Sequence, residues 1–399
     1  MRRRSFLQSV LLLPAILLLA ACGTLLRQPA PTDRPPPTFD GFGNIRYYPL
    51  ASGFGLPDLT DAYRVEAPDQ YQIEADGTVV YSYLALSGGG SAGAFGAGLL
   101  NGWTAKGDRP KFKVVTGVST GALISTLAFL GPDYDDELKE AYTTIDATHI
   151  YIAQNLLSLI WSESVTDNKP FRDMIAKYLT NGVLDKVAAE YKKGRRLYVL
   201  TSDLDRELPV IWDLGAIASS SSPRRLDLYR QVVLASASIP AVFPPVLINV
   251  TVDGKPYDEL HVDGGVFAQS FFIGNSLDLK KTVHDAHPGW KKDAIQRLYV
   301  IRNGRIDAQT RVTNRTLGSI SGNSISTMLK ISGINDLYRL YVGELTGELE
   351  FYYVAFPIGY MPVSAEEFNK EEMNKEYDLG YKYGTEGIPW QRMPPGYRP

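Results

Sequence analysis

The chain has 399 residues, of which 44% are hydrophobic and 21% charged, and its formal net charge is −3. This suits one large α/β domain or two small ones, and the near-neutral charge gives no reason to expect a nucleic-acid partner. The single cysteine excludes an intramolecular disulfide. No group of His, Cys and carboxylate residues has metal-ligand spacing, so we expect no metal and no other cofactor.

Residues 1–21 have the pattern of a signal peptide, with three arginines before an apolar run too short to span a bilayer. The run ends in Leu19-Ala20-Ala21-Cys22-Gly23, which resembles the bacterial lipobox. In that motif the cysteine receives a diacylglycerol and becomes the mature N-terminus. We therefore predict lipidation of Cys22, although an ordinary signal peptide with a chance cysteine is the alternative. Gly23 stands where an aspartate would resemble an inner-membrane retention signal, which favours the outer membrane, facing the periplasm.

Three further regions follow the signal peptide. Residues 22–38 contain many prolines, which favour extended polyproline II and oppose packing, so we predict a lipidated tether that holds the domain a few nanometres from the membrane. Residues 39–76 mix aromatics and prolines without a period and are expected to be an irregular segment, which either wraps the domain or contacts a partner. Residues 77–399 form the main domain, with a helical and strand extension at the C-terminus.

A nucleophile-elbow pattern, Gly-x-Ser-x-Gly, lies at residues 117–121. A β-branched run at 114–116 predicts a buried strand before it, and an apolar helical pattern follows it to residue 130. The turn would hold Ser119 at its tip, at the positive end of the helix, with no side chain to clash at Gly117 and Gly121. The alternative is a glycine-rich turn whose serine only caps the helix.

A second glycine-rich turn, at residues 87–93, follows a predicted strand at 79–86 and precedes a helix of small residues. Three consecutive glycines leave backbone N–H groups unhindered, as an oxyanion hole requires: Gly88, Gly89 and Gly90. One such donor contributes a factor of roughly 10²–10³ to the rate of acyl transfer. Phosphate binding is the rival interpretation, but neither Gly-x-Gly-x-x-Gly nor a Gly-Lys-Ser/Thr ending is present.

Strand and helix patterns alternate along the rest of the chain. We expect residues 133–189 to be mainly helical, with apolar stripes at 156–161 and 171–179 in the core; a lipid-facing lid is the alternative for these stripes. Strands are predicted at 197–202, 208–214, 260–263, 297–302 and 349–356, and helices at 227–237, 316–345 and 365–383. This alternation indicates an α/β fold with a mostly parallel central sheet flanked by helices. Sites in such sheets form at the carboxyl ends of strands.

A serine nucleophile needs a group that takes its proton. None of the four histidines has a distinctive setting: His149, His261, His284 and His287. Asp263 ends a predicted strand, and the paired glycines after it, Gly264 and Gly265, let other backbone approach its carboxylate. The alternative is an ordinary turn with an aspartate cap.

Four blocks occur in the order and spacing of the patatin-like phospholipases and resemble that family: residues 88–93, 117–121, 235–245 and 263–265. The resemblance covers roughly residues 79–265, and the helix at 368–384 extends it more loosely. It implies the family's three-layer α/β/α fold and cleavage of lipid acyl esters. Carried onto this sequence, it makes Ser119 the nucleophile, Asp263 the base, and the three glycines of the second turn the oxyanion hole.

Together the lipobox and the resemblance predict a bacterial lipoprotein that hydrolyses membrane lipids as a phospholipase A or lysophospholipase-like serine esterase. Two departures leave the headgroup preference open: Ala92 stands where the family often has Arg or Lys, and residues 269–271 replace its Asn-Pro pattern. A lipid-binding envelope lipoprotein with little hydrolysis is the alternative from another class. A peptidase or thioesterase fits the four blocks poorly. The sequence indicates no particular protein partner.

Overall fold

The computed structural model describes residues 27–50, 59–153, 164, 166–276, 278–308, 310, 312–364 and 366–398. The predicted signal peptide, Cys22 and the apolar stripe at 156–161 lie outside these ranges. Across the described residues, no helix combines the length and the apolar character needed to cross a membrane.

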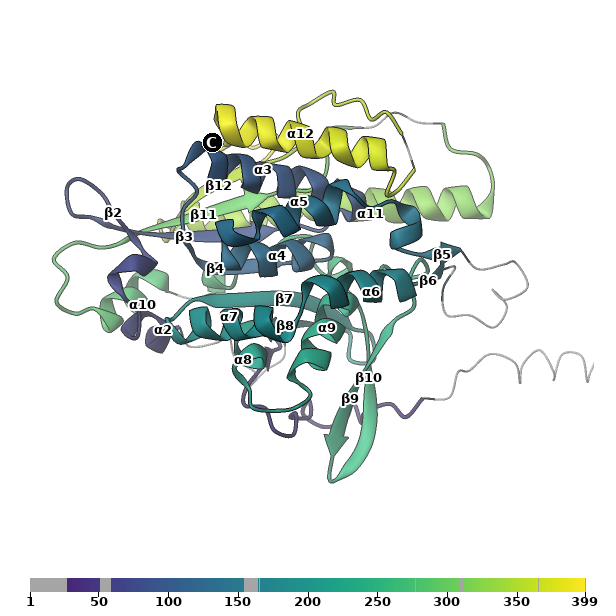
Figure 1. The fold of residues 1–399 in the computed structure, drawn as a ribbon, viewed down its shortest axis with the longest axis horizontal. Helices are drawn as coiled ribbons and strands as arrows, with labels where there is room; N and C mark the ends of the chain where they lie inside the picture. The colour runs from purple at the N-terminus through teal and green to yellow at the C-terminus, as the bar shows by residue number, and fades with distance from the viewer. Residues whose placement is uncertain are drawn as a thin grey trace, which may run out of the picture.

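A ten-stranded sheet occupies the centre of the molecule (Figure 1). Five neighbouring strands are parallel, in the order β7 (Arg196–Asp203), β4 (Phe112–Gly117), β3 (Val79–Leu86), β11 (Ile295–Ile301) and β12 (Glu350–Val354). Antiparallel strands complete it: β8 (Leu208–Asp213), β1 (Arg46–Tyr47), β2 (Gln72–Ile73), β9 (Val246–Val252) and β10 (Lys255–Asp263). The predicted α/β class with a mostly parallel central sheet is confirmed.

Hydrophobic cores lie on both faces of this sheet, because alternate residues of its strands point to opposite sides. On β3, Leu84 and Leu86 belong to one core, whereas Tyr83 and Ala85 belong to the other. The helices that pack on the first face include α3 (Gly93–Lys106), α4 (Thr120–Leu130), α5 (Asp135–Thr143), α6 (Lys169–Tyr178), α7 (Asn181–Lys192), α8 (Leu214–Ser219), α9 (Arg225–Ser236) and α12 (Lys370–Glu386). Those on the second are α2 (Thr60–Arg64), α10 (Leu279–Ala286) and α11 (Leu317–Leu345). The three-layer prediction is confirmed.

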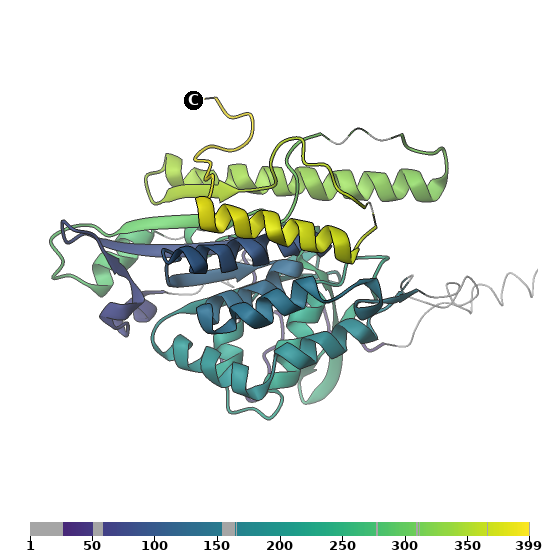
Figure 2. The same ribbon diagram turned by 45° about the horizontal axis from the view of Figure 1, so that its top comes forward.

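Two helices from distant parts of the sequence, α3 and α12, lie side by side (Figures 1 and 2). Their facing residues are glycines four apart, Gly98 and Gly102 on α3, Gly380 and Gly384 on α12. A Cβ atom at any of these positions would clash with the backbone of the opposite helix. The two backbones therefore touch, and α12 is an integral part of the domain rather than an appendage.

The proline-rich segment packs against the domain, contrary to the predicted free tether. The Arg27 guanidinium bonds to the carboxylates of Asp205 and Asp258, at 2.9 and 2.7 Å. Arg206 then donates to the backbone carbonyls of Pro31 and Arg34. An extended proline-rich backbone has unpaired carbonyls, and arginine can bind them. The prediction is wrong for residues 27–38, and only residues 22–26 of the expected tether lie outside the described chain.

Residues 39–76 are less irregular than predicted. They contribute β1, which pairs with β8 at the edge of the sheet, β2, which pairs with the start of β3, and α2. Phe39 is buried with its ring 5.6 Å from that of Trp212. These elements are too short to show a period in the sequence.

Candidate active site

Ser119 lies at a sharp turn between β4 and α4, at the carboxyl end of the parallel strands. Its backbone has φ 55° and ψ −126°, a strained conformation for a residue with a side chain. A Cβ on Gly117 would clash with the carbonyl of Gly121, and one on Gly121 would clash with the carbonyl of Leu86. Both glycines are therefore required by the turn, as the sequence predicted.

Ser236 holds this strained turn in place from the end of α9. The Ser119 N–H donates to Ser236 Oγ at 3.0 Å, and the Ser236 hydroxyl donates to the carbonyl of Leu200 on β7 at 2.7 Å. Such support is needed because strain persists only where the surroundings fix it. Sequence reasoning used residues 235–245 only as a block of the resemblance and missed this positioning role.

Asp263 lies at the end of β10, beside β7. Its backbone N–H donates to the carbonyl of Ser238 at 2.9 Å, and its carbonyl accepts from the Ser202 hydroxyl at 2.8 Å. A Cβ on Gly264 would clash with β7, and the Gly265 N–H donates to Asp263 Oδ1 at 2.6 Å. The two glycines of the acidic turn therefore serve close packing and carboxylate binding.

The structure places the Asp263 carboxylate beside the Ser119 hydroxyl. Burial raises the pKa of Asp263 to about 7, against the opposing effect of its hydrogen bond with the Gly265 N–H and of the neighbouring Ser119 hydroxyl. No cation is among the groups that shift this pKa. The carboxylate is therefore a much stronger base than an exposed aspartate and lies next to the hydroxyl that would lose a proton.

The glycine-rich turn between β3 and α3 differs from the prediction at its first glycine. The Gly88 N–H already donates to the backbone carbonyl of Gln269 at 3.0 Å, so it is not available to an oxyanion, and that part of the prediction is wrong. Among the described residues no hydrogen bond engages the N–H of Gly89 or Gly90. Thr120 adds a third N–H at the start of α4, where a helix has no internal acceptor for it.

Residues outside the four blocks fix this turn. The Arg302 guanidinium donates to the Gly88 carbonyl at 3.2 Å, and the Asn303 side chain donates to the Ser87 carbonyl at 2.9 Å. A side chain on Gly89 would clash with the Asn303 carbonyl. Both supporting residues follow β11, far along the chain, so no local sequence pattern could have identified them.

Gln269 joins the acidic turn to the oxyanion turn. Its side chain donates to the Gly265 carbonyl at 3.2 Å, while its backbone carbonyl accepts the Gly88 N–H. Its backbone N–H donates in turn to Asp336 on α11 at 2.6 Å. The residue that departs from the family's Asn-Pro pattern therefore has a structural function here.

His261 is buried, but its hydrogen bonds point away from the nucleophile. Its Nδ1 lies 3.0 Å from Thr201 Oγ1 and its Nε2 lies 3.4 Å from Glu259 Oε2, with the Trp212 ring packed at 5.6 Å. Within the described chain, none of its hydrogen bonds reaches Ser119. The geometry thus offers Asp263, not His261, to the serine hydroxyl.

The other histidines have partners of their own or lie in solvent. His149 pairs with Asp146 at 3.0 Å, and His287 stacks on Trp290 with ring centroids 4.0 Å apart. His284 is exposed on α10. Among the described residues, none of the three forms a hydrogen bond with Ser119.

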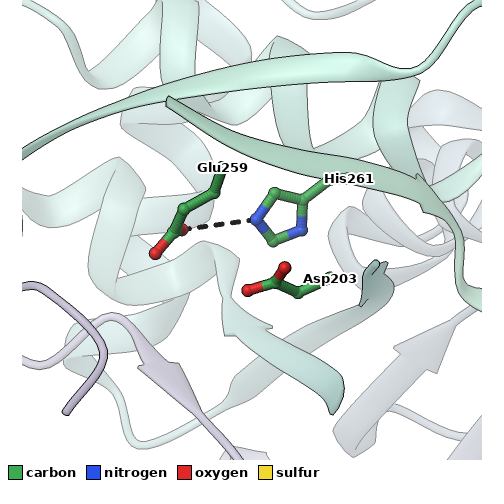
Figure 3. Close-up of side chains that lie close together, drawn as sticks. All are labelled: Asp203, Glu259 and His261. Carbon is green, nitrogen blue, oxygen red and sulfur yellow. Dashed lines mark hydrogen bonds and ion pairs between the residues drawn. The ribbon is translucent and has the colours of Figure 1, made fainter. Parts of the chain in front are cut away.

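Asp203, Glu259 and His261 form a buried cluster in which one potential ligand atom from each lies within 4.8 Å of the others (Figure 3). Such a group could hold a metal, but two guanidinium groups already face its carboxylates. Arg46 Nη1 lies 2.5 Å from Glu259 Oε2, and Arg206 Nε lies 3.7 Å from Asp203 Oδ2. We therefore interpret the cluster as a charge network that fastens β1 to β10.

Comparison with known proteins agrees with this geometry. Residues 84–272 match the family model described as patatin-like phospholipase. No curated protein matches the chain. The chain therefore contains a patatin-like phospholipase domain, which places it among the lipid hydrolases. The family resemblance carried by the four sequence blocks is confirmed.

Two solved proteins are similar at low identity. VipD from Legionella pneumophila is 12% identical, with 84% of this chain and 71% of that chain covered and a TM-score of 0.38. ExoU from the type III secretion system of Pseudomonas aeruginosa, solved in complex with SpcU, is 15% identical, with 72% and 58% covered and a TM-score of 0.24. The chain thus spans less than two thirds of the ExoU chain.

Proposed function

We propose that the protein hydrolyses lipid acyl esters with Ser119 as nucleophile and Asp263 as its base. One observation carries the proposal. A carboxylate that is buried without a cation, with a pKa of about 7, lies beside the hydroxyl of a serine on a strained elbow. Two groups tuned and placed in this way are expected at a site of acyl transfer.

In the proposed reaction, Ser119 Oγ attacks the ester carbonyl carbon while its proton passes to Asp263. The negative charge that develops on the carbonyl oxygen is met by the N–H groups of Gly89, Gly90 and Thr120. Asp263 then returns the proton to the departing alcohol, which leaves an acyl-serine. Water, deprotonated by Asp263, attacks this ester, and the fatty acid leaves as Ser119 regains its proton.

The proposal includes attachment to the bacterial cell envelope through lipidated Cys22, at the outer membrane and facing the periplasm. It rests on the lipobox and on the apolar run before it. A protein anchored in this way meets its acyl-ester substrates in the membrane that holds it. Replacement of Cys22 by Ser should abolish lipid attachment, measured by mass spectrometry of the N-terminal peptide. An unmodified Cys22 in the mature wild-type protein would contradict the anchor.

The test of the chemistry is Ser119→Ala, assayed on a chromogenic acyl ester. We expect no measurable turnover in a folded protein, and a fluorophosphonate probe should label the wild type at Ser119 alone. Ser125→Ala is the matched control, since Ser125 is a buried serine on the helix that follows Ser119, and its hydroxyl donates to the carbonyl of Ala122. A wild-type protein that binds lipid without turnover would instead favour the lipid-binding alternative.

A further inference from the structure

The long helix α11 passes the active-site loops and continues beyond them. Its Gly333 lies against the Arg302 guanidinium, and its Asp336 accepts N–H groups from Gln269 and Ser270. Residues 317–332 extend further, over ~24 Å at ~1.5 Å per residue. In Figure 1 this end of α11 projects past the sheet on the side where β5 (Ile152–Ala153) and β6 (Thr166–Asp167) lie, and Figure 2 shows the same projection.

The projecting half of α11 carries an exposed apolar stripe. Leu317 is 84% exposed and Met328 is 69% exposed, and three isoleucines are exposed between and after them: Ile320, Ile325 and Ile331. Most of these positions recur at spacings of three or eight residues, so they share one face of the helix. The charged residues of the segment 312–335 are two cations, Arg315 and Lys330, and it contains no acidic residue.

This half of the helix gains little stability from its own sequence. Residues 318–327 read GSISGNSIST and consist largely of glycine, serine and other weak helix formers. None of the side chains from 317 to 332 is buried against the domain. Most helical stability in proteins comes from packing of an apolar face, so a surface that covers this stripe would supply what the free helix lacks.

A second apolar patch adjoins the first. The loop after β12 exposes Ile358 and Met361, at 82% and 74%. Asp307 connects the two patches, because its carboxylate accepts the Gly359 N–H at 3.1 Å and its carbonyl accepts the Lys330 ammonium at 3.2 Å. The apolar surface therefore spans two elements of the fold.

The start of the described chain lies at the same edge of the sheet. Arg27 is held by Asp258 on β10, three residues before His261. His261 pairs with Asp203, the last residue of β7, so Asp258 lies past the carboxyl end of that strand. Cys22 precedes Arg27 by five residues, which span at most ~18 Å. A lipid on Cys22 would therefore hold this edge, and the apolar surface on it, close to the bilayer.

We propose that the stripe of α11 and the loop of Ile358 and Met361 form a membrane-binding face. This face inserts into the headgroup region of a bilayer that contains anionic lipids, and it turns the edge of the sheet that carries Ser119 toward the lipids. An apolar stripe flanked by cations suits such a surface. The orientation rests on the proposed anchor at Cys22, whereas the surface itself rests on α11. A second copy of the chain fits less well, since two copies of the segment 312–335, whose only charged residues are cations, would repel.

A fluorophore attached at a new cysteine tests this face directly. Full-length Met328→Cys and Leu345→Cys proteins are labelled with an environment-sensitive thiol dye and added to phosphatidylcholine–phosphatidylglycerol vesicles. Leu345 is the matched control, because it is 58% exposed at the opposite end of the same helix. The wild-type protein, treated with the same dye, shows how much label attaches to Cys22.

We expect a blue shift, and quenching by brominated lipids, at position 328 and not at position 345. Equal emission at the two positions in vesicles would overturn the proposal. Disulfide cross-linking of Met328→Cys between copies in lipid-free detergent would also overturn it, in favour of a dimer. Because this readout needs no turnover, it stands whether or not Ser119 is the nucleophile.

Activity gives a second measurement. The double variant Met328→Ser, Ile331→Ser should hydrolyse phospholipid vesicles about tenfold more slowly and a water-soluble ester at the wild-type rate. Val342→Ser with Leu345→Ser is the control and should leave both rates unchanged. Equal loss on both substrates would assign α11 to the catalytic site and would overturn a membrane-binding role, as would unchanged vesicle hydrolysis.

Discussion

Two buried carboxylates lie four residues apart on β10 and differ in what surrounds them. Glu259 faces the Arg46 guanidinium at 2.5 Å, whereas Asp263 faces a serine hydroxyl and a backbone N–H. Burial by itself would raise the pKa of both. Arg46 and His261 outweigh burial at Glu259 and lower its pKa to about 2, while burial prevails at Asp263 and raises its pKa to about 7.

The comparison shows how one strand carries both an inert anion and a base. Burial of an acid creates a base near neutral pH only where the fold provides no cation to offset it. A paired buried carboxylate instead fixes structure, and removing its partner leaves an uncompensated charge. The two sites should therefore respond in opposite ways to the loss of charge.

The largest effect is expected from Asp263→Asn. Loss of the base should reduce kcat by about 10³-fold or more, measured on a soluble ester. The raised pKa means that the folded state binds this proton more tightly than the unfolded state, so the wild type loses stability as pH rises from about 4 to about 7. Asparagine does not ionise and so avoids that loss. At pH 8 the free energy of unfolding of the variant, measured by thermal unfolding, should exceed that of the wild type by at most roughly 4 kcal/mol. Wild-type turnover by the folded variant would contradict the assignment.

Glu259→Gln should lower the stability of the protein and leave its activity unchanged, the converse of Asp263→Asn. It leaves Arg46 buried without its partner, at a cost of about 3–5 kcal/mol in the free energy of unfolding. The pKa of Glu259 is lowered in the fold, so its contribution is present above about pH 4.5 and is lost as pH falls toward 2. Denaturant unfolding at pH 7 and pH 3 measures this, and kcat per folded molecule should not change. Glu140→Gln, at an exposed pair with Lys177, is the control and should shift unfolding little.

The pH profile of the wild type is the third prediction. Because only ionised Asp263 accepts the serine proton, kcat/KM should rise about tenfold per pH unit below 7 and level off above it. Hydrolysis of a soluble ester whose own ionisation does not change between pH 5 and 9 measures the profile. A flat profile from pH 5 to pH 8 would show that another group, or an unperturbed carboxylate, takes the proton.

The smallest effect is expected from His261→Ala. The histidine bonds to Thr201 and Glu259, so its loss should weaken the charge network but keep at least about a tenth of the activity. The midpoint of the pH profile should stay where it is. Alanine at the other three histidines should be as mild: His149, His284 and His287. A folded His261→Ala protein as inactive as Ser119→Ala would replace the dyad with a triad.

The sequence predicted the parts of the site whose chemistry constrains neighbouring residues. A nucleophile at the tip of a tight strand-to-helix turn demands glycines two residues before and after it, and a strand-end aspartate demands glycines where other backbone passes. Ser119 and Asp263 were therefore recognisable, and the structure places them together. Their roles in catalysis remain predictions.

Contacts between residues that are distant in the sequence could not be predicted from local patterns. The Gly88 N–H was misassigned because its acceptor, Gln269, lies far along the chain and comes near only through the fold. Residues 27–38 were expected to stay free because a proline-rich composition opposes packing. Composition does not show that Arg206, Asp205 and Asp258, which are distant in the sequence, bind that segment at the edge of the sheet.

The glycine-to-glycine contact between α3 and α12 affects the moment at which the site forms during synthesis. The ribosome makes α12 long after α3, which begins where the oxyanion turn ends, and among the described residues the backbone of α12 is what lies closest to Gly98 and Gly102. We therefore expect a nascent chain that ends before residue 370 to contain the serine and the aspartate without a firmly held oxyanion turn. The hydrolase would then gain its activity only after α12 has been made. An incomplete chain would therefore not hydrolyse lipids during its synthesis.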